Sequence, residues 1–305
     1  MSREIRPGLI SVLIASMGRA SLRQTLESVA RAQLPDGYSV EIVVADDSPD
    51  GAAGRIVAQC AIGLPLTLVP VGARNASIAR NACLDGARGE WLAFVDDDET
   101  VDSLWLMGLV EAAREFAADG VFGPVRHLYP EGTPDWFGKA DPMFYDLDWK
   151  RIGHRAATGH TANALIRHAT LARLGMRFDA GFGRSGGEDD DLFRRMSAAG
   201  ARLVVTDRAV VFEQVPAARA TKAYIMIRAI RGGQTYGKIT LRDLSGLGRL
   251  RFGLEALTKL VLTGAGGLAL YPFDRARAFR LRIRAAANWG KLLALTDAPL
   301  KSSWS

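Results

Sequence analysis

Phe94-Val95-Asp96-Asp97-Asp98-Glu99 closes the apolar run at residues 91–95, so four acidic side chains follow directly on a strand apolar enough to be buried. Carboxylates that lie side by side raise one another's pKa and destabilise the fold unless a cation compensates them. Mg²⁺ and Mn²⁺ prefer oxygen ligands, and an Asp-x-Asp pair at a strand end presents two carboxylates on one side. The stretch therefore indicates a divalent metal shared with a phosphate-bearing ligand; the alternative is a solvated acidic turn that caps the next helix.

The first 125 residues alternate between strand-like and helix-like stretches. Continuous apolar runs predict strands, and apolar residues spaced by three or four predict helices. This alternation favours a parallel sheet covered by helices on both faces, in which ligands bind at the carboxyl ends of the strands. The predicted strands are 9–15, 40–45, 66–71 and 91–95, and the predicted helices are 21–32, 52–61, 75–87 and 102–118.

Two further strand ends bear on the ligand. The second strand ends in Ala45-Asp46-Asp47-Ser48-Pro49-Asp50-Gly51, a second acidic end at the same edge of a parallel sheet. The first strand ends in Ala15-Ser16-Met17-Gly18-Arg19 and lacks the G-x-G-x-x-G pattern, so a dinucleotide fingerprint is absent where it is expected.

The second half of the chain has a different pattern. Residues 123–158 are rich in proline and aromatic residues with little periodicity, which predicts an irregular excursion, a mobile loop over a site. From residue 221 onward the pattern is mostly helical. Between these regions we expect regular structure to resume at 161–167, followed by a short helix to 175, a helix at 191–199 and a strand at 203–212.

Length and cysteine content set the broad class. A chain of 305 residues is expected to form one large domain, or one domain with an appendage. Two cysteines, Cys60 and Cys83, make no disulfide framework, and the first residues lack signal-peptide architecture. Both features favour a cytoplasmic protein.

The positive charge is concentrated at the C-terminal end. Residues 215–305 hold 16 Lys and Arg against 4 Asp and Glu, a balance of +12, whereas the first 214 residues balance to −6. Such a region favours an anionic partner, either membrane headgroups or nucleic acid. The uncharged run at 260–273 is short for a membrane span, and the basic residues of 275–291 alternate with apolar ones. We therefore predict contact with an anionic membrane surface and no nucleic acid; the alternative is an ordinary surface helix.

Five stretches occur in the order and with the spacing of one enzyme family. They are ISVLIAS at 10–16, VVADDS at 43–48, NASIARNA at 75–82, FVDDD at 94–98 and GGEDDDLFRR at 186–195. Over roughly residues 8–215 the chain thus resembles family 2 glycosyltransferases of the GT-A fold, and within them bacterial exopolysaccharide glycosyltransferases of the succinoglycan type. The resemblance implies an α/β fold with a mostly parallel central sheet flanked by helices. It implies a catalytic domain at 1–215, with a nucleotide-binding half at 1–122 and an acceptor-side half at 123–215, and a helical C-terminal extension at 216–305.

The resemblance also implies a binding site for a nucleotide-sugar donor. Asp47 would accept a hydrogen bond from the nucleobase, unless it only caps the following helix. Arg80 would lie near the donor diphosphate or Asp96, and Asp96 would contact the ribose or sugar. Ala15 and Asp97 complete the expected donor-binding set, although strand alternation turns Asp97 away from its neighbours.

The resemblance also implies a metal ligand and a general base, each at an acidic position. Asp98 would hold Mn²⁺ or Mg²⁺, which neutralises charge on the departing nucleotide. Asp189 would be the general base that takes the proton of the acceptor hydroxyl. Glu188 would orient or assist it, and Asp191 is the next candidate. The alternative is purely structural, because acidic residues at the start of a helix are favoured by the helix dipole.

Departures from the family pattern limit the expected activity. Glu213 or Gln214 stands where many relatives carry a histidine that reaches the metal or the diphosphate. The membrane helices and the Gln-x-x-Arg-Trp motif of processive synthases are absent, which favours a single sugar transfer.

The predicted function is that of an inverting, metal-dependent hexosyltransferase of family 2. It would transfer one sugar from a nucleotide-sugar, with UDP the commonest nucleotide in the family, to a lipid-linked oligosaccharide. This reaction would serve surface polysaccharide synthesis, peripherally at the inner face of the plasma membrane. The alternatives are a non-catalytic scaffold with the same fold, and a haloacid-dehalogenase-type phosphatase. The phosphatase pattern fits residues 96–100, but residues 151–220 hold no lysine for it.

Overall fold

The computed structural model describes residues 4–143, 151–184, 186–242 and 244–296. The chain divides into two compact units. Met1–Arg126 and Tyr145–Glu213 form the first, which we call the sheet unit, and His127–Phe144 and Gln214–Ser305 form the second, the helical unit.

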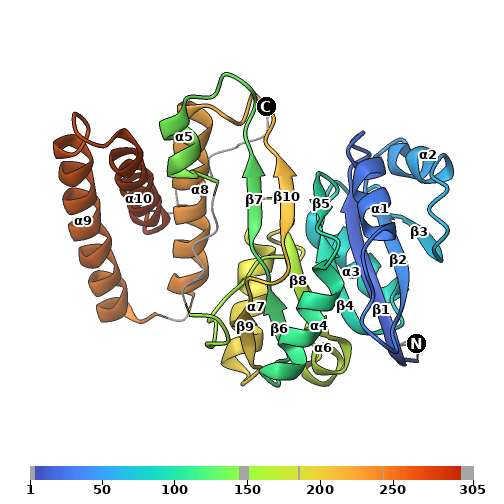
Figure 1. Cartoon of the computed structure of the whole chain (residues 1–305). Helices are drawn as coiled ribbons and strands as arrows, with labels where there is room; N and C mark the ends of the chain where they lie inside the picture. The colour runs from blue at the N-terminus through green and yellow to red at the C-terminus, as the bar shows by residue number, and fades with distance from the viewer. Residues whose placement is uncertain (1–3, 144–150, 185, 243, 297–305) are drawn as a thin grey trace. The chain divides into compact units, whose positions relative to one another are not determined.

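The sheet unit is built on a seven-stranded sheet within the described ranges (Figure 1). Its strands run parallel except for β8, which is antiparallel to both of its neighbours. The prediction of a mostly parallel central sheet is confirmed. In order across the sheet, the strands are β3 (Leu66–Pro70), β2 (Ser39–Asp46), β1 (Arg6–Ser16), β4 (Gly89–Val95), β8 (Asn163–Arg167), β6 (Gly120–Phe122) and β9 (Leu203–Val205).

Helices cover both faces of this sheet. Successive strand residues point to opposite faces, so Val12 and Ile14 pack in one apolar layer and Leu13 in the other. Burial on both sides explains why the strands are continuous apolar runs in the sequence. One face carries α1 (Leu22–Ala30), α2 (Ala52–Ala58) and α4 (Trp105–Glu115), and the other carries α3 (Ala76–Gly86), α6 (His168–Leu174) and α7 (Glu188–Ala198).

A second, three-stranded sheet has the order β5 (Glu99–Val101), β10 (Val211–Gln214) and β7 (Val125–Leu128). The single strand predicted at 203–212 is thus two strands, β9 and β10. The chain leaves the large sheet after Val205 and pairs with β5 from Val211 onward. This pairing places Glu213 opposite Glu99, directly after the acidic turn at 96–98.

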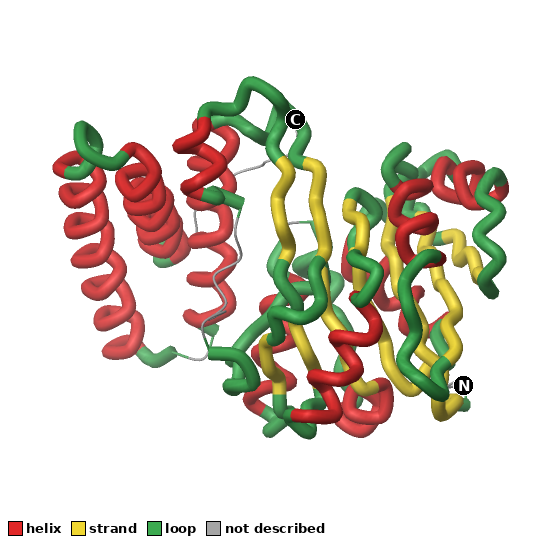
Figure 2. Tube along the Cα trace, in the orientation of Figure 1, coloured by secondary structure: helices red, strands yellow, loops and turns green. Residues whose placement is uncertain are grey.

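The helical unit contains more regular structure than the sequence indicated. It comprises α5 (Asp135–Ala140), α8 (Lys222–Leu241), α9 (Gly246–Ala269) and α10 (Arg275–Ala294) (Figure 2). The expected irregular excursion at 123–158 therefore includes a strand, β7, and a helix, α5; its residues 144–150 lie outside the described ranges. Phe137 and Met143 pack with Ile225 and Phe279, which is why 127–144 group with the C-terminal helices instead of with the predicted domain 1–215.

The basic helix α10 is the central helix of this unit. It packs against both α8 and α9, and it buries Ala278, Phe279, Ala286 and Gly290. Phe279 and its small apolar residues therefore contact neighbouring helices, although the sequence favoured contact of the apolar residues with a membrane; Trp289 is 47% exposed. None of the helices in the described ranges is both long and apolar enough to span a bilayer.

Two glycines allow α8 and α10 to touch backbone to backbone. A Cβ atom on Gly233 would lie 1.9 Å from the carbonyl oxygen of Ala287, and one on Gly290 would lie 2.0 Å from that of Ile230. We expect Gly233→Ala to destabilise the protein by about 1–3 kcal/mol, because the helices must separate to admit the methyl group. The measurement is urea unfolding followed by circular dichroism.

The adjacent Gly232 provides the matched control, since a Cβ there meets nothing within 4 Å. Gly232→Ala should leave stability unchanged or raise it by up to about 1 kcal/mol, the usual helix preference for alanine. Equal effects of the two substitutions would contradict the close helix contact.

Candidate active site

The carboxyl ends of three parallel strands meet at one edge of the large sheet. Ser16 at the end of β1 lies opposite Asp46 at the end of β2, and β4 runs on the other side of β1. The acidic turn that follows β4 therefore lies at the same edge as Asp46 and Asp47. Ala15, one of the expected donor-binding residues, lies on β1 opposite Ala45.

The two aspartates after β2 have different tasks. Asp46 accepts hydrogen bonds from the backbone N–H of Ser48 (3.1 Å) and Gly54 (2.8 Å), and the Ser48 hydroxyl accepts from Ala52 (2.7 Å), so Asp46 and Ser48 together bind the first turn of α2. Asp47 is buried, and its carboxylate accepts from three successive backbone N–H groups, those of residues 73 (2.7 Å), 74 (2.8 Å) and 75 (2.6 Å). A carboxylate offers about four acceptor positions, so one remains for a further donor.

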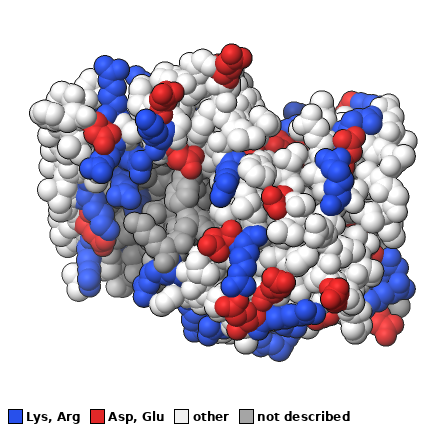
Figure 3. Space-filling model, viewed as in Figure 1, with Lys and Arg blue, Asp and Glu red and all other residues white. Residues whose placement is uncertain are grey.

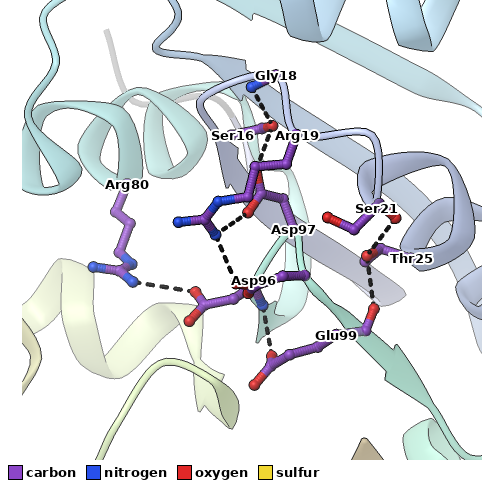
Figure 4. A network of polar contacts seen from close by, with 10 residues as sticks. Ser16, Gly18, Arg19, Ser21, Thr25, Arg80, Asp96, Asp97 and Glu99 are labelled. Carbon is purple, nitrogen blue, oxygen red and sulfur yellow. Dashed lines mark hydrogen bonds and ion pairs between the residues drawn. The ribbon is translucent and has the colours of Figure 1, made fainter. Parts of the chain in front are cut away.

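Asp96, Asp97 and Asp98 form a tight turn that closes on Glu99. The side chain of Glu99 accepts from the backbone N–H of Asp96 (2.8 Å). Asp97 is directed toward the loop after β1, where it accepts from the hydroxyl of Ser16 (2.6 Å) and from the guanidinium of Arg19 (2.8 Å) (Figure 4). Strand alternation does not separate Asp97 from Asp98, because both residues lie in a turn beyond β4 and their carboxylates contact the same guanidinium nitrogen of Arg19.

Arg19 is the residue of this site to which the sequence assigned no role. One guanidinium nitrogen of Arg19 lies 2.8 Å from a carboxylate oxygen of Asp97 and 2.8 Å from one of Asp98. Gly18 has a φ of +80°, and a Cβ there would lie 2.3 Å from that of Ala52, so the loop that carries Arg19 requires glycine. The signal in the sequence was its position, a basic residue three positions after the end of β1, next to two strands that end in acidic residues.

Arg19 does not fully compensate the acidic turn. Burial raises the pKa of Asp98 to about 6, and the carboxylates of Asp96 and Glu213 add to this effect while Arg19 opposes it. Burial, reinforced by the same two carboxylates, holds the pKa of Glu99 well above its usual range. Glu213, one of the two residues in the region where many relatives carry a histidine, is thus part of the acidic site.

The carboxylates of the acidic turn suit a divalent cation that takes its remaining ligands from outside the protein. The side chain of Asp98 is 17% exposed and presents hard oxygen donors in a site with excess negative charge. The described residues contain no group of three or more His, Cys, Asp or Glu side chains that could hold a metal ion. An ion at Asp98 would therefore need further oxygen ligands, as Mg²⁺ obtains them from substrate phosphates and water.

Arg80 links the acidic turn to the start of α7. Its guanidinium lies 3.2 Å from Asp96 and pairs with Glu188, and the Arg80 side chain is only 12% exposed. Figure 4 shows Arg80 reaching from α3 toward Asp96. The nearby carboxylates of Glu188, Asp96 and Asp189 raise the pKa of Arg80 despite its burial, so it remains charged.

The four acids at the start of α7 differ in their partners. Gly187 has a φ of +97°, the left-handed conformation that lets the chain turn into the helix. Asp190 pairs with Arg194 and accepts a hydrogen bond from Thr158, and Asp191 is buried against Arg195 (2.8 Å). These partners give Asp190 and Asp191 structural roles, which weakens the case for Asp191 as a base.

The carboxylates of Glu188 and Asp189 are less completely compensated than those of Asp190 and Asp191. One carboxylate oxygen of Glu188 pairs with Arg80, and the other is buried and has no hydrogen-bond partner in the described part of the chain. Burial, together with the neighbouring Glu188 carboxylate, raises the pKa of Asp189 to about 7, against the opposing effect of Arg80. A carboxylate with such a pKa can accept a proton near neutral pH.

The comparisons with known proteins agree with this geometry. The family model described as Glycosyl transferase family 2 matches residues 11–175, more than half of the chain. Succinoglycan biosynthesis protein ExoM of Rhizobium meliloti (strain 1021) is 35% identical over 288 residues, which cover 94% of this chain and 92% of that protein.

Two solved structures show the fold. The mannosyltransferase PcManGT from Pyrobaculum calidifontis, in complex with GDP-Man and Mn²⁺, has a TM-score of 0.61 at 21% identity, covering 95% of this chain and 88% of that one. S. aureus TarS 1-349 in complex with UDP has a TM-score of 0.54 at 17% identity, covering 95% and 92%. The sheet, its flanking helices and these neighbours identify the GT-A fold. The match to the family model and the identity to ExoM along nearly the whole chain show that this protein belongs to glycosyltransferase family 2 and is a glycosyltransferase.

Proposed function

We propose that this enzyme transfers one sugar from a UDP-sugar to a lipid-linked oligosaccharide, with inversion at the anomeric carbon and with Mn²⁺ or Mg²⁺ bound. The observation that carries the proposal is the bridge of Arg80 between Asp96 and Glu188. It joins the strand-end carboxylates, which suit the donor, to the start of α7, which holds a carboxylate suited to act as a base. Donor binding and proton removal thereby belong to one charged network.

The donor would bind along the strand ends. Asp47 would use its remaining acceptor position for an N–H of the nucleobase, and Ala15 on the neighbouring strand β1 would line the donor site. Asp96, whose side chain is 35% exposed, would accept hydrogen bonds from the ribose or the sugar. Asp97 would act through Ser16 and Arg19, which it holds in place.

Asp98 would hold the metal ion, with donor phosphates and water as the remaining ligands. The bound ion would supply positive charge for the departing nucleotide. Arg19 now compensates Asp98, and it would remain paired with Asp97 when Asp98 binds the ion.

Asp189 would take the proton of the acceptor hydroxyl as the oxygen attacks the anomeric carbon. Direct attack by the acceptor needs one base and no covalent intermediate, which accounts for inversion. Glu188 assists because its negative charge raises the proton affinity of Asp189, and Arg80 keeps that affinity in a useful range. Asp191, held by Arg195, would stabilise the start of α7.

The pH dependence follows from the raised pKa of Asp189. Below about pH 7 the carboxyl is protonated and cannot accept a proton, so kcat/KM should fall by about tenfold per pH unit on the acidic side and level off above it. The measurement is a pH–rate profile at subsaturating donor. Asp189→Glu keeps a carboxylate but places it in a different environment, so it should shift the pH at which kcat/KM falls. A wild-type profile of kcat/KM that is flat across neutral pH would contradict the assignment of the base.

The proposed acceptor and the proposed membrane location are supported by the similarity to ExoM and by the basic C-terminal region of the sequence. ExoM is named for succinoglycan biosynthesis, which supports a role in exopolysaccharide synthesis. We propose that the polymer is assembled on a lipid-linked intermediate, which is the acceptor of this enzyme. The enzyme would then act peripherally at the inner face of the plasma membrane.

A transfer assay tests the proposal. Membranes that carry lipid-linked oligosaccharides are incubated with the enzyme and a panel of radiolabelled UDP-, dTDP- and GDP-sugars, with Mn²⁺ or with a chelator. We expect label from a UDP-sugar in the lipid extract, dependent on the metal. Label that enters only water-soluble products, or transfer that is insensitive to chelation, would overturn the acceptor or the metal part, respectively.

A further inference from the structure

Helix α9 has far fewer buried side chains than its neighbours in the helical unit. Of its 24 residues, Ala256 and Gly267 are buried, and the helix packs against α10. The opposite side of α9 is exposed. A helix of this length presents an outward face of about 36 Å.

The outward face of α9 is apolar along its whole length. Its large apolar side chains recur at intervals of three, four and seven residues, which places them on one side of a helix. Their exposed fractions lie between 48% and 79%. We call this set the α9 stripe: Leu247, Leu250, Leu254, Leu257, Val261 and Leu268.

Exposed aromatic side chains extend the stripe at its C-terminal end. Tyr271 is 44% exposed and Phe273 is 85% exposed, in the turn that leads to α10. A continuous exposed apolar surface of this kind marks an interaction site on a protein. Aromatic residues at its end are typical of the boundary between lipid and water.

Positive charge borders the stripe. Arg251 and Lys259 of α9 are exposed, as are Arg275 and Arg277 of α10. The two described acids beyond residue 214, Glu255 and Asp274, already pair with Lys259 and Arg277. Figure 3 shows Lys and Arg side chains gathered beside the uncharged surface of the helical unit.

We propose that the α9 stripe inserts into the interface of an anionic lipid membrane, with α9 parallel to the membrane surface and the basic side chains on the headgroups. An apolar face flanked by Lys and Arg has the composition of helices that lie in such interfaces. A second copy of the chain is the other possible occupant, but it would bring together two regions that each carry a balance of +12. Charge therefore favours an anionic surface over self-association.

The test is vesicle flotation of the full-length protein without donor or acceptor. Vesicles of phosphatidylcholine alone are compared with vesicles of phosphatidylcholine and phosphatidylglycerol. We expect binding to the mixed vesicles that weakens, without vanishing, at high salt, because salt screens the charges but leaves the apolar contact. The combined variant Leu250→Gln, Leu254→Gln and Leu257→Gln should bind the mixed vesicles at least about tenfold more weakly than the wild type. Glutamine keeps the helix but removes the apolar contact with the lipid.

Matched controls are Ile227→Gln and Leu128→Gln, which change exposed apolar residues of the helical unit outside the stripe. They should bind vesicles like the wild type. Equal flotation of the triple variant and the wild type would overturn the proposal, as would a wild-type dimer in lipid-free solution that the triple variant abolishes. Nucleotide binding is measured on the same samples and should be unchanged, so this proposal and the transfer reaction can fail separately.

Discussion

Replacing Asp189 with asparagine is expected to lower kcat about 10²–10⁴-fold, the usual contribution of a positioned general base. The amide has the shape of the carboxyl group but cannot accept the proton of the acceptor hydroxyl. Donor binding should be unchanged, because the proposed donor contacts lie at the ends of β1, β2 and β4. The measurement is turnover of the donor under saturating conditions.

Stability gives an independent check on the same variant. The pKa of Asp189 is about 7 in the folded protein and about 4 in an unfolded chain, so the folded state binds the proton more tightly. Stability contributed by this group is therefore lost as the pH rises through that interval. Asp189→Asn should consequently be at least as stable as the wild type at pH values above neutrality.

Asp190→Asn is the matched control for the base. Its carboxylate is held by Arg194 and Thr158, so we expect a modest loss of stability and a rate close to that of the wild type. Wild-type turnover in Asp189→Asn, or an equal loss in both variants, would contradict the assignment of the base to Asp189.

Arg80→Met is expected to destabilise the sheet unit by about 3 kcal/mol or more, the usual result of removing one partner from a buried ion pair. The substitution leaves Glu188 and Asp96 without their shared cation, and the Glu188 side chain is only 9% exposed. The remaining negative charges should also raise the pKa of Asp189, so residual activity should require a higher pH. Urea unfolding and a pH–rate profile measure the two effects.

Two controls separate this network from an ordinary surface pair. Arg80→Lys keeps the charge but cannot present the planar fork that bridges two carboxylates, so a partial loss is expected. Arg177→Met removes an exposed pair with Asp85 and should cost at most about 1 kcal/mol. An effect of Arg80→Met no larger than that of Arg177→Met would contradict the buried bridge.

The large sheet could be predicted from the sequence because its strands are buried on both faces. The runs that became β1, β2 and β4 are mostly apolar, and the carboxyl ends of such parallel strands are where ligands bind; acidic residues follow β2 and β4 there. Asp47, Asp96, Asp98 and Asp189 were chosen because their stretches resemble family 2 motifs, and their roles stay predictions. Their position at a strand end or a helix start is a local property of the sequence.

The features that were missed depend on contacts between distant segments. Arg19 reaches Asp98 across 79 residues, and α5 is held against α10 by a hydrogen bond from Arg280 to the carbonyl oxygen of Lys139. Helices α9 and α10 are both apolar in part, and only their packing decides which one keeps an exposed apolar face. No local pattern contains that information.

The central claim is a metal-dependent nucleotide site at the strand ends, and calorimetry tests it most directly. UDP, dTDP and GDP are titrated with and without Mn²⁺ into the wild type, into Asp98→Ala and into Asp85→Ala, a surface carboxylate outside the site. We predict that UDP binds to the wild type and to Asp85→Ala only with Mn²⁺, and that Asp98→Ala loses this binding. Failure of every nucleotide to bind with or without the metal, or binding that Asp98→Ala leaves intact, would contradict the account.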